Sequence, residues 1–92
     1  MNAVYKQNWI ESERGWGIRP DGVSLHLSID ECATYIKKYW EGMPDDAPDE
    51  YSRPSGHPIL VEVSDEVYNK VHAAQGEHGL RIWQHELSKF NL

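Results

Sequence analysis

Residues 23–43 read VSLHLSIDECATYIKKYWEGM, and this stretch decides the fold because a strand signal runs directly into a helix signal. Its first six residues alternate between apolar and polar side chains, which is the period of a strand with one buried side. Ser28 and Glu31 then form a capping box, a pair that satisfies the first free amides of a helix. We therefore predict a half-buried strand that leads into a helix.

The helix is expected to run as far as Gly42 and Pro44, two residues that stop helices. Apolar and aromatic residues recur within it at the spacing of one helical face. Cys32 belongs to this stripe and is interpreted as a small core residue, not as a reactive thiol. The full stripe comprises Ile29, Cys32, Ala33, Ile36, Tyr39, Trp40 and Met43.

Upstream, the stretch GWGIRPDG (residues 15–22) predicts a β-hairpin with the strand that follows. Its Pro-Asp-Gly has the residue types of a tight turn. Pairing Arg19 with Ser24 brings the apolar residues of both strands to one face. A lone Gly-x-Gly outside a strand–loop–helix context is a weak sign of a phosphate-binding loop, so its glycines are assigned to hairpin geometry. Another strand, from Val4 to Glu11, is expected before this hairpin.

Residues 42–58, GMPDDAPDEYSRPSGHP, predict a long loop because prolines and carboxylates interrupt any regular pattern. Loops of this length are usually functional or disordered. Tyr51 and Arg53 are expected to anchor the loop to the domain. Its carboxylates, the leading candidates for contact with a partner, are Asp45, Asp46, Asp49 and Glu50.

The last third of the chain predicts two strands and a helix. Residues 58–63 carry apolar side chains on both faces, as in a central strand. Ser64 is the expected cap of a second helix that ends near Gly76. A final strand over 80–86 is expected to point Arg81 and Trp83 to one side, with Leu80 and Ile82 on the other.

Together these elements indicate one α+β domain over residues 1–92. The expected order is β-β-β-α-β-α-β, with a mostly antiparallel sheet and two helices on one face.

The composition limits the possible partners. The 92 residues include 15 acidic and 9 basic ones, for a formal charge of −6. This charge argues against binding to a phosphate backbone and suits a basic protein partner. Cys32 is the only cysteine, which fits a reducing cytoplasm. Because neither a signal peptide nor a membrane span is recognised, a soluble cytoplasmic protein is expected.

No motif in the chain specifies an enzyme or a metal centre. The five histidines show no H-E-x-x-H spacing and have no Cys-x-x-Cys beside them, so they are interpreted as isolated surface residues. Residues 55–57, Ser-Gly-His, lack the G-x-S-x-G pattern of a nucleophile elbow. We therefore expect no catalytic residues, no metal and no cofactor. The histidines are His26, His57, His72, His78 and His85.

Four tryptophans and five tyrosines exceed what a core of this size needs. Such residues, together with arginine, dominate the hot spots of protein interfaces. Trp9, Arg14 and Arg19 also form a local mixture of cations and an aromatic ring that could stack on a base. Binding of a nucleotide or single-stranded nucleic acid is therefore one alternative, and a small enzyme of unknown chemistry is another.

In size, acidity, tryptophan content and its DDAPDE segment (residues 45–50), the chain resembles small acidic accessory proteins of phages and mobile elements, including anti-CRISPR-type inhibitors. The resemblance implies a non-catalytic inhibitor, in the host cytoplasm if phage-encoded. Its partner would be a larger protein or ribonucleoprotein assembly with a basic surface. The carboxylates of this segment, with Tyr51 and Arg53, would cover arginines or lysines that otherwise hold phosphates.

Overall fold

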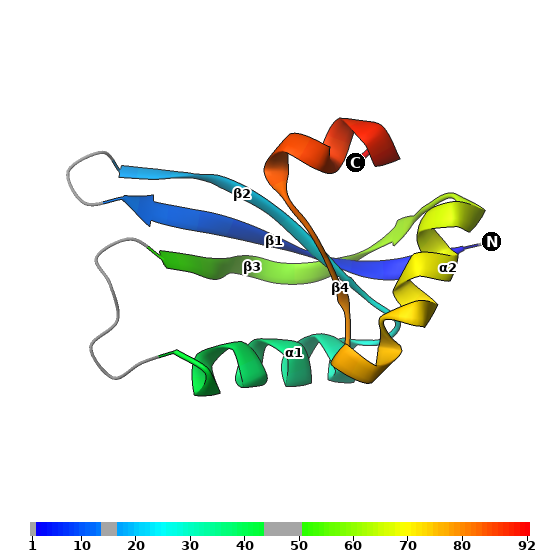
Figure 1. Cartoon of the computed structure of the whole chain (residues 1–92), viewed down its shortest axis with the longest axis horizontal. Helices are drawn as coiled ribbons and strands as arrows, with labels where there is room; N and C mark the ends of the chain where they lie inside the picture. Colours follow the sequence, from blue (N-terminus) through cyan, green and yellow to red (C-terminus); the bar gives the residue numbers. More distant parts are fainter. Residues whose placement is uncertain (1, 14–16, 44–50) are drawn as a thin grey trace.

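The computed structural model describes residues 2–13, 17–43 and 51–92 (Figure 1). Four strands form one antiparallel sheet in the order β3-β1-β2-β4. None of the helices in these ranges is long and apolar enough to cross a membrane. The elements are β1 (Ala3–Glu13), β2 (Gly17–His26), α1 (Ile29–Glu41), β3 (Tyr51–Glu62), α2 (Asp65–Ala73), η1 (Gln75–Glu77), β4 (Leu80–Ile82) and η2 (Gln84–Phe90), where η marks a 3₁₀ helix.

The α+β class and the antiparallel sheet are confirmed, but the order of elements differs from the prediction. The chain runs β-β-α-β-α-β because residues 17–26 form one strand instead of a hairpin. Arg19 therefore pairs with Glu11 of β1, not with Ser24. The Pro-Asp-Gly stretch forms an irregularity inside β2, where the register against β1 shifts. Gly22 has φ +85° there, and a Cβ would overlap the Ile82 carbonyl oxygen.

The predicted loop over 42–58 is also wrong in its second half, since β3 begins at Tyr51. β3 lies at an edge of the sheet, not in its centre, and an edge strand tolerates residues that cannot donate to a ladder. Pro54 pairs with Trp9, and the register shift beyond it accommodates Gly56 at φ +72°. The Gln7 side chain donates to the Ser55 and Gly56 carbonyls at 3.1 and 3.2 Å and so holds this irregular stretch.

Both predicted helix caps are confirmed. The Ser28 hydroxyl accepts a hydrogen bond from the Glu31 amide at 3.1 Å, and α1 starts at the next residue. The Ser64 hydroxyl accepts from the Val67 amide at 3.3 Å at the start of α2. The last predicted strand is shorter than expected, because β4 ends at Ile82 and a 3₁₀ helix follows.

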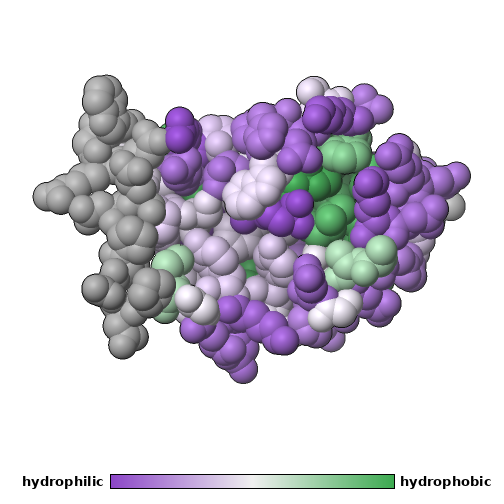
Figure 2. Space-filling view, viewed as in Figure 1, coloured by the Kyte–Doolittle hydropathy of each residue, from purple (hydrophilic) through white to green (hydrophobic). Residues whose placement is uncertain are grey.

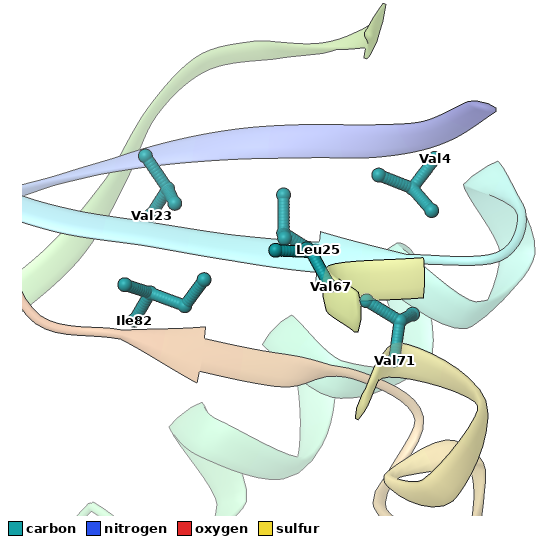
Figure 3. Packing of buried hydrophobic residues seen from close by; sticks show 6 residues of the cluster. All are labelled: Val4, Val23, Leu25, Val67, Val71 and Ile82. Atoms are coloured by element: carbon teal, nitrogen blue, oxygen red, sulfur yellow. The ribbon is translucent and has the colours of Figure 1, made fainter. Parts of the chain in front are cut away.

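One face of the sheet, which we call the apolar face, carries the hydrophobic core. Alternation along β1 and β2 points Val4, Val23 and Leu25 to this face, and the β4 pairing adds Ile82. α2 covers it, and in Figure 2 the apolar colours gather between α2 and η2. The buried cluster, drawn in Figure 3, consists of Val4, Val23, Leu25, Val67, Val71 and Ile82.

The other face, which we call the polar face, lies under α1. Tyr35 of α1 contacts the rings of Trp9 and His26 on this face, at centroid distances of 6.1 and 5.1 Å. The two helices thus cover opposite faces, whereas the sequence predicted both on one. The alternating pattern marks one side of a strand as polar, but it does not say what lies over that side. The inward residues of the polar face are Gln7, Trp9, Ser24, His26 and Arg81.

Candidate protein-binding surface

A series of buried hydrogen bonds crosses the polar face of the sheet and links Trp9, Ser24, His26 and the His78 carbonyl. The Trp9 indole N–H donates to the Ser24 hydroxyl at 2.8 Å. His26 Nε2 lies 2.7 Å from that hydroxyl, and His26 Nδ1 lies 2.7 Å from the His78 carbonyl. A carbonyl only accepts, so Nδ1 carries the proton, and the Ser24 hydroxyl donates to Nε2. The series is therefore complete with a neutral imidazole.

His26 was predicted to be an exposed residue, and this is wrong. Its side chain is buried beneath α1, and burial lowers its pKa below the usual value, against an opposing effect of the His78 carbonyl and Glu31. Gly79 leaves the space for the ring, since a Cβ there would overlap it.

The Ser24–His26 pair has the hydrogen bond of a catalytic nucleophile and its base, but a substrate cannot reach the Ser24 oxygen. Neither residue has exposed surface. The Trp9 indole already occupies the remaining side of the hydroxyl. A substrate carbonyl must approach such an oxygen closely, so the pair is structural in this arrangement.

Arg81 connects this buried layer to the surface. Its guanidinium carbon lies 4.4 Å from the centre of the Trp9 ring and 4.5 Å from that of Trp83. The Nη2 atom donates to the Asp21 carbonyl at 2.6 Å and lies 3.2 Å from its carboxylate. Burial lowers the pKa of Arg81, while Asp21 and the Tyr35 hydroxyl oppose that shift. Arg81 is thus held as a flat cation between two indoles.

Aromatic rings continue this arrangement to the start of β3. Tyr39 meets Trp9 at 5.0 Å, Trp40 meets Tyr39 at 5.2 Å, and Tyr51 meets Trp40 at 6.1 Å, all edge to face. The Tyr39 hydroxyl also donates to the Ser52 carbonyl, which ties the end of α1 to β3. We call this series the ring stack, and its members are Tyr51, Trp40, Tyr39, Trp9, Arg81 and Trp83.

The ring stack reaches solvent at two tryptophans. Trp40 is 42% exposed and Trp83 is 47% exposed, whereas Trp9 between them is 1% exposed. In Figure 2 the middle of the molecule has the pale colours of intermediate hydropathy, beside the apolar region near α2. Large exposed rings on a rigid buried support are typical of residues that anchor a protein partner.

The structure brings together only some of the residues proposed from the sequence. Tyr51 belongs to the ring stack, while Arg53 lies opposite Ile10 in β3 and outside the stack. Trp9 is buried and offers no face to a base. Arg19 forms an ion pair with Glu11 at 2.9 Å. The remaining candidates, Arg14, Asp45, Asp46, Asp49 and Glu50, lie outside the described residues.

Trp40, Arg81 and Trp83 were not among the predicted site residues. A usable signal was present, since Arg81 and Trp83 are two apart in a predicted strand and therefore share a side. Trp40 was assigned to the core because it fits the helical stripe, yet that stripe is wider than the surface that α1 buries.

A hollow lies between α1 and β3, with a volume of about 240 Å³. Ile36 and Pro58 line it, together with Cys32 and His57. Burial raises the pKa of the Cys32 thiol, so the reactive thiolate is disfavoured. Among the residues that the structure describes, no group of three or more histidine, cysteine or carboxylate side chains could hold a metal ion.

No family model, curated protein or solved structure matches this chain.

Proposed function

We propose that this protein is a non-catalytic binding protein that covers a basic, nucleic-acid-handling surface of a larger assembly, as anti-CRISPR-type inhibitors do. One observation carries the proposal: the ring stack exposes two tryptophans, Trp40 and Trp83, on a buried support. Tryptophan, tyrosine and arginine are the residues that contribute most binding energy at protein interfaces.

Preorganisation favours this role for the ring stack. A flexible side chain loses conformational entropy when a partner immobilises it. Trp83 is already packed on Arg81, and Trp40 is already packed between Tyr39 and Tyr51. A partner that buries these rings therefore gains apolar contact with little ordering cost.

The charge of the chain favours a basic partner. The formal charge is −6, and five carboxylates lie in the sequence between Trp40 and Tyr51, whose rings are in contact. Carboxylates form strong paired hydrogen bonds with arginine and speed the approach of a positive surface. The nucleic-acid alternative is less well supported, because Trp9 is buried and Arg19 is paired with Glu11.

The test begins with isolation of the partner by cross-linking to the tagged full-length chain, followed by mass spectrometry. Affinities for the purified partner are then compared between the wild type, Trp83→Ala and Trp40→Ala. We expect each tryptophan variant to weaken binding about tenfold or more, as hot-spot truncations do. The matched control is Ile18→Ala, which removes another exposed apolar side chain, on β2, and should leave affinity unchanged.

Three results would contradict the proposal. Wild-type affinity in both tryptophan variants would remove the ring stack from the interface. A mobility shift of a single-stranded oligonucleotide by the chain alone would favour the nucleic-acid alternative. Turnover of a substrate by the purified chain would make it an enzyme.

A further inference from the structure

The outer edge of β3 has two different halves. From Tyr51 to Pro58 it contains Pro54, the positive φ of Gly56 and a register shift, all of which interrupt a regular edge. Natural proteins use such features to keep edges from pairing. From Ile59 to Glu62 the strand is regular and pairs residue for residue with β1. This second half lacks any such interruption.

The backbone hydrogen bonds show which groups point outward from this regular half. The Val63 amide donates to the Asn2 carbonyl at 2.8 Å, so Val63 faces the β1 side. Residues of an antiparallel strand alternate in this respect, which directs Val61 and Ile59 toward β1 as well. Leu60 and Glu62 therefore present both their N–H and C=O groups to the open edge.

The side chains at this edge are exposed and apolar. Ile59 is 52% exposed and Leu60 is 60% exposed, on opposite faces of the strand. Within the described part of the chain, no strand pairs with this side of β3. α2, which follows Val63, packs on the apolar face of the sheet, where its Val67 and Val71 cluster with Val4 (Figure 3). The edge is thus open to a further strand.

We propose that this edge binds a second copy of the chain, with the two β3 strands antiparallel and centred on Val61. In this register Leu60 of each copy exchanges both backbone hydrogen bonds with Glu62 of the other. Val61 lies opposite Val61 of the second copy, and Ile59 lies opposite Val63. One face of the joined strands then carries a continuous row of β-branched apolar side chains, a pairing that stabilises sheets.

The neighbouring registers are poorer. Centring on Leu60 sets Glu62 against Pro58, which has no N–H to donate. Centring on Glu62 places two carboxylates directly opposite each other, which destabilises a sheet. The strand is therefore self-complementary in one register. The contact is small, so we expect a reversible dimer that forms as concentration rises.

The association is tested by sedimentation equilibrium of the full chain over a range of concentrations. The wild type should approach twice its mass of 10.6 kDa, whereas Leu60→Pro should remain a monomer. This proline removes an outward N–H and sacrifices no bond to β1. Leu60→Thr is the matched control, because it shortens the side chain and keeps the backbone donor; it should still dimerise. Circular dichroism should show all three folded.

The register is tested by disulfide cross-linking in a Cys32→Ala background. Val61→Cys should form a disulfide between copies under mild oxidation, because facing residues in a non-hydrogen-bonded pair have Cα atoms about 4.5 Å apart. Ile59→Cys should not, since its counterpart lies four residues along the strand.

A wild type that stays monomeric at every concentration would overturn the proposal. Dimerisation of Leu60→Pro would place the interface elsewhere. Equal cross-linking at both cysteine positions would show that the copies meet by random collision and not in the proposed register. If the chain stays monomeric while a basic apolar peptide perturbs the amide resonances of 59–62, the edge serves a different partner.

Discussion

The two faces of the sheet are built from the same strands, yet different forces hold their helices in place. On the apolar face, α2 packs valines against Val4 and Leu25 and removes them from water. On the polar face, α1 covers Trp9, Ser24 and His26, which are joined by hydrogen bonds. The first arrangement depends on volume and apolar area. The second depends on the hydrogen bonds that join Trp9, Ser24 and His26, because a buried polar group left without a partner costs free energy.

The largest expected effect lies on the apolar face. Leu25 has no exposed surface and lies in the centre of the cluster. Leu25→Ala should lower the free energy of unfolding by about 2–5 kcal/mol through lost burial and a residual cavity. Urea denaturation followed by tryptophan fluorescence measures this change. A loss well below 1 kcal/mol would mean that the apolar face is not the main core.

A smaller loss is expected on the polar face. The alternating sequence predicts that His26→Ala is near neutral, but the buried ring satisfies both Ser24 and the His78 carbonyl. Its removal should lower the free energy of unfolding by about 1–3 kcal/mol, the usual penalty for leaving buried polar groups without hydrogen-bond partners. Denaturation of this variant beside His72→Ala, at an exposed position, separates the effect from a general loss of histidine. Equal stability of the two variants would contradict the series of buried hydrogen bonds.

Sequence patterns predicted those features of the fold that depend on neighbouring residues alone. The caps at Ser28 and Ser64 depend on neighbouring residues alone, and both helices start where the pattern places them. Alternation in residues 23–27 identified the apolar side of β2 for the same reason.

The wrong or missing predictions concern features that depend on contacts between residues far apart in the sequence. Pro-Asp-Gly at 20–22 suits a turn as well as a bulge, and only the pairing with β1 decides between them. Pro54 and Pro58 look like loop residues unless the strand is known to lie at an edge. Likewise, no local pattern shows that Arg81 sits between Trp9, which lies on β1, and Trp83, which follows β4.

The attachment of α1 can be weakened without touching either face. Ser28→Ala removes the acceptor for the Glu31 amide and should cost about 0.5–2 kcal/mol. Urea denaturation is again the measurement, with Ser28→Asp as the control because aspartate also caps helices. If alanine and aspartate behave alike, the capping bond contributes nothing to holding α1 over the polar face.

Acid should affect the polar face more than the apolar one. Burial lowers the pKa of His26, so below its usual value of 6.5 the unfolded chain takes up a proton that the folded chain resists. The stabilisation from the neutral imidazole is thus present above pH 6.5 and is lost as the pH falls, by at most about 1.4 kcal/mol per pH unit. The wild type should lose more stability than His26→Asn between pH 7 and pH 5. Parallel curves would show that His26 titrates normally.

The smallest expected effect on stability belongs to four carboxylates of the sequence that lie outside the described residues. Asp45, Asp46, Asp49 and Glu50 can be changed together to the neutral amides. The sequence predicts that these carboxylates lie in an exposed loop, and exposed carboxylates contribute little to folding, so the melting temperature should stay almost unchanged. Association with the partner should nevertheless slow and lose its salt dependence, because long-range attraction to a basic surface has been removed. Stopped-flow measurements from low to high salt separate these effects. Identical rates for both proteins at every salt concentration would leave the exposed tryptophans alone to hold the partner.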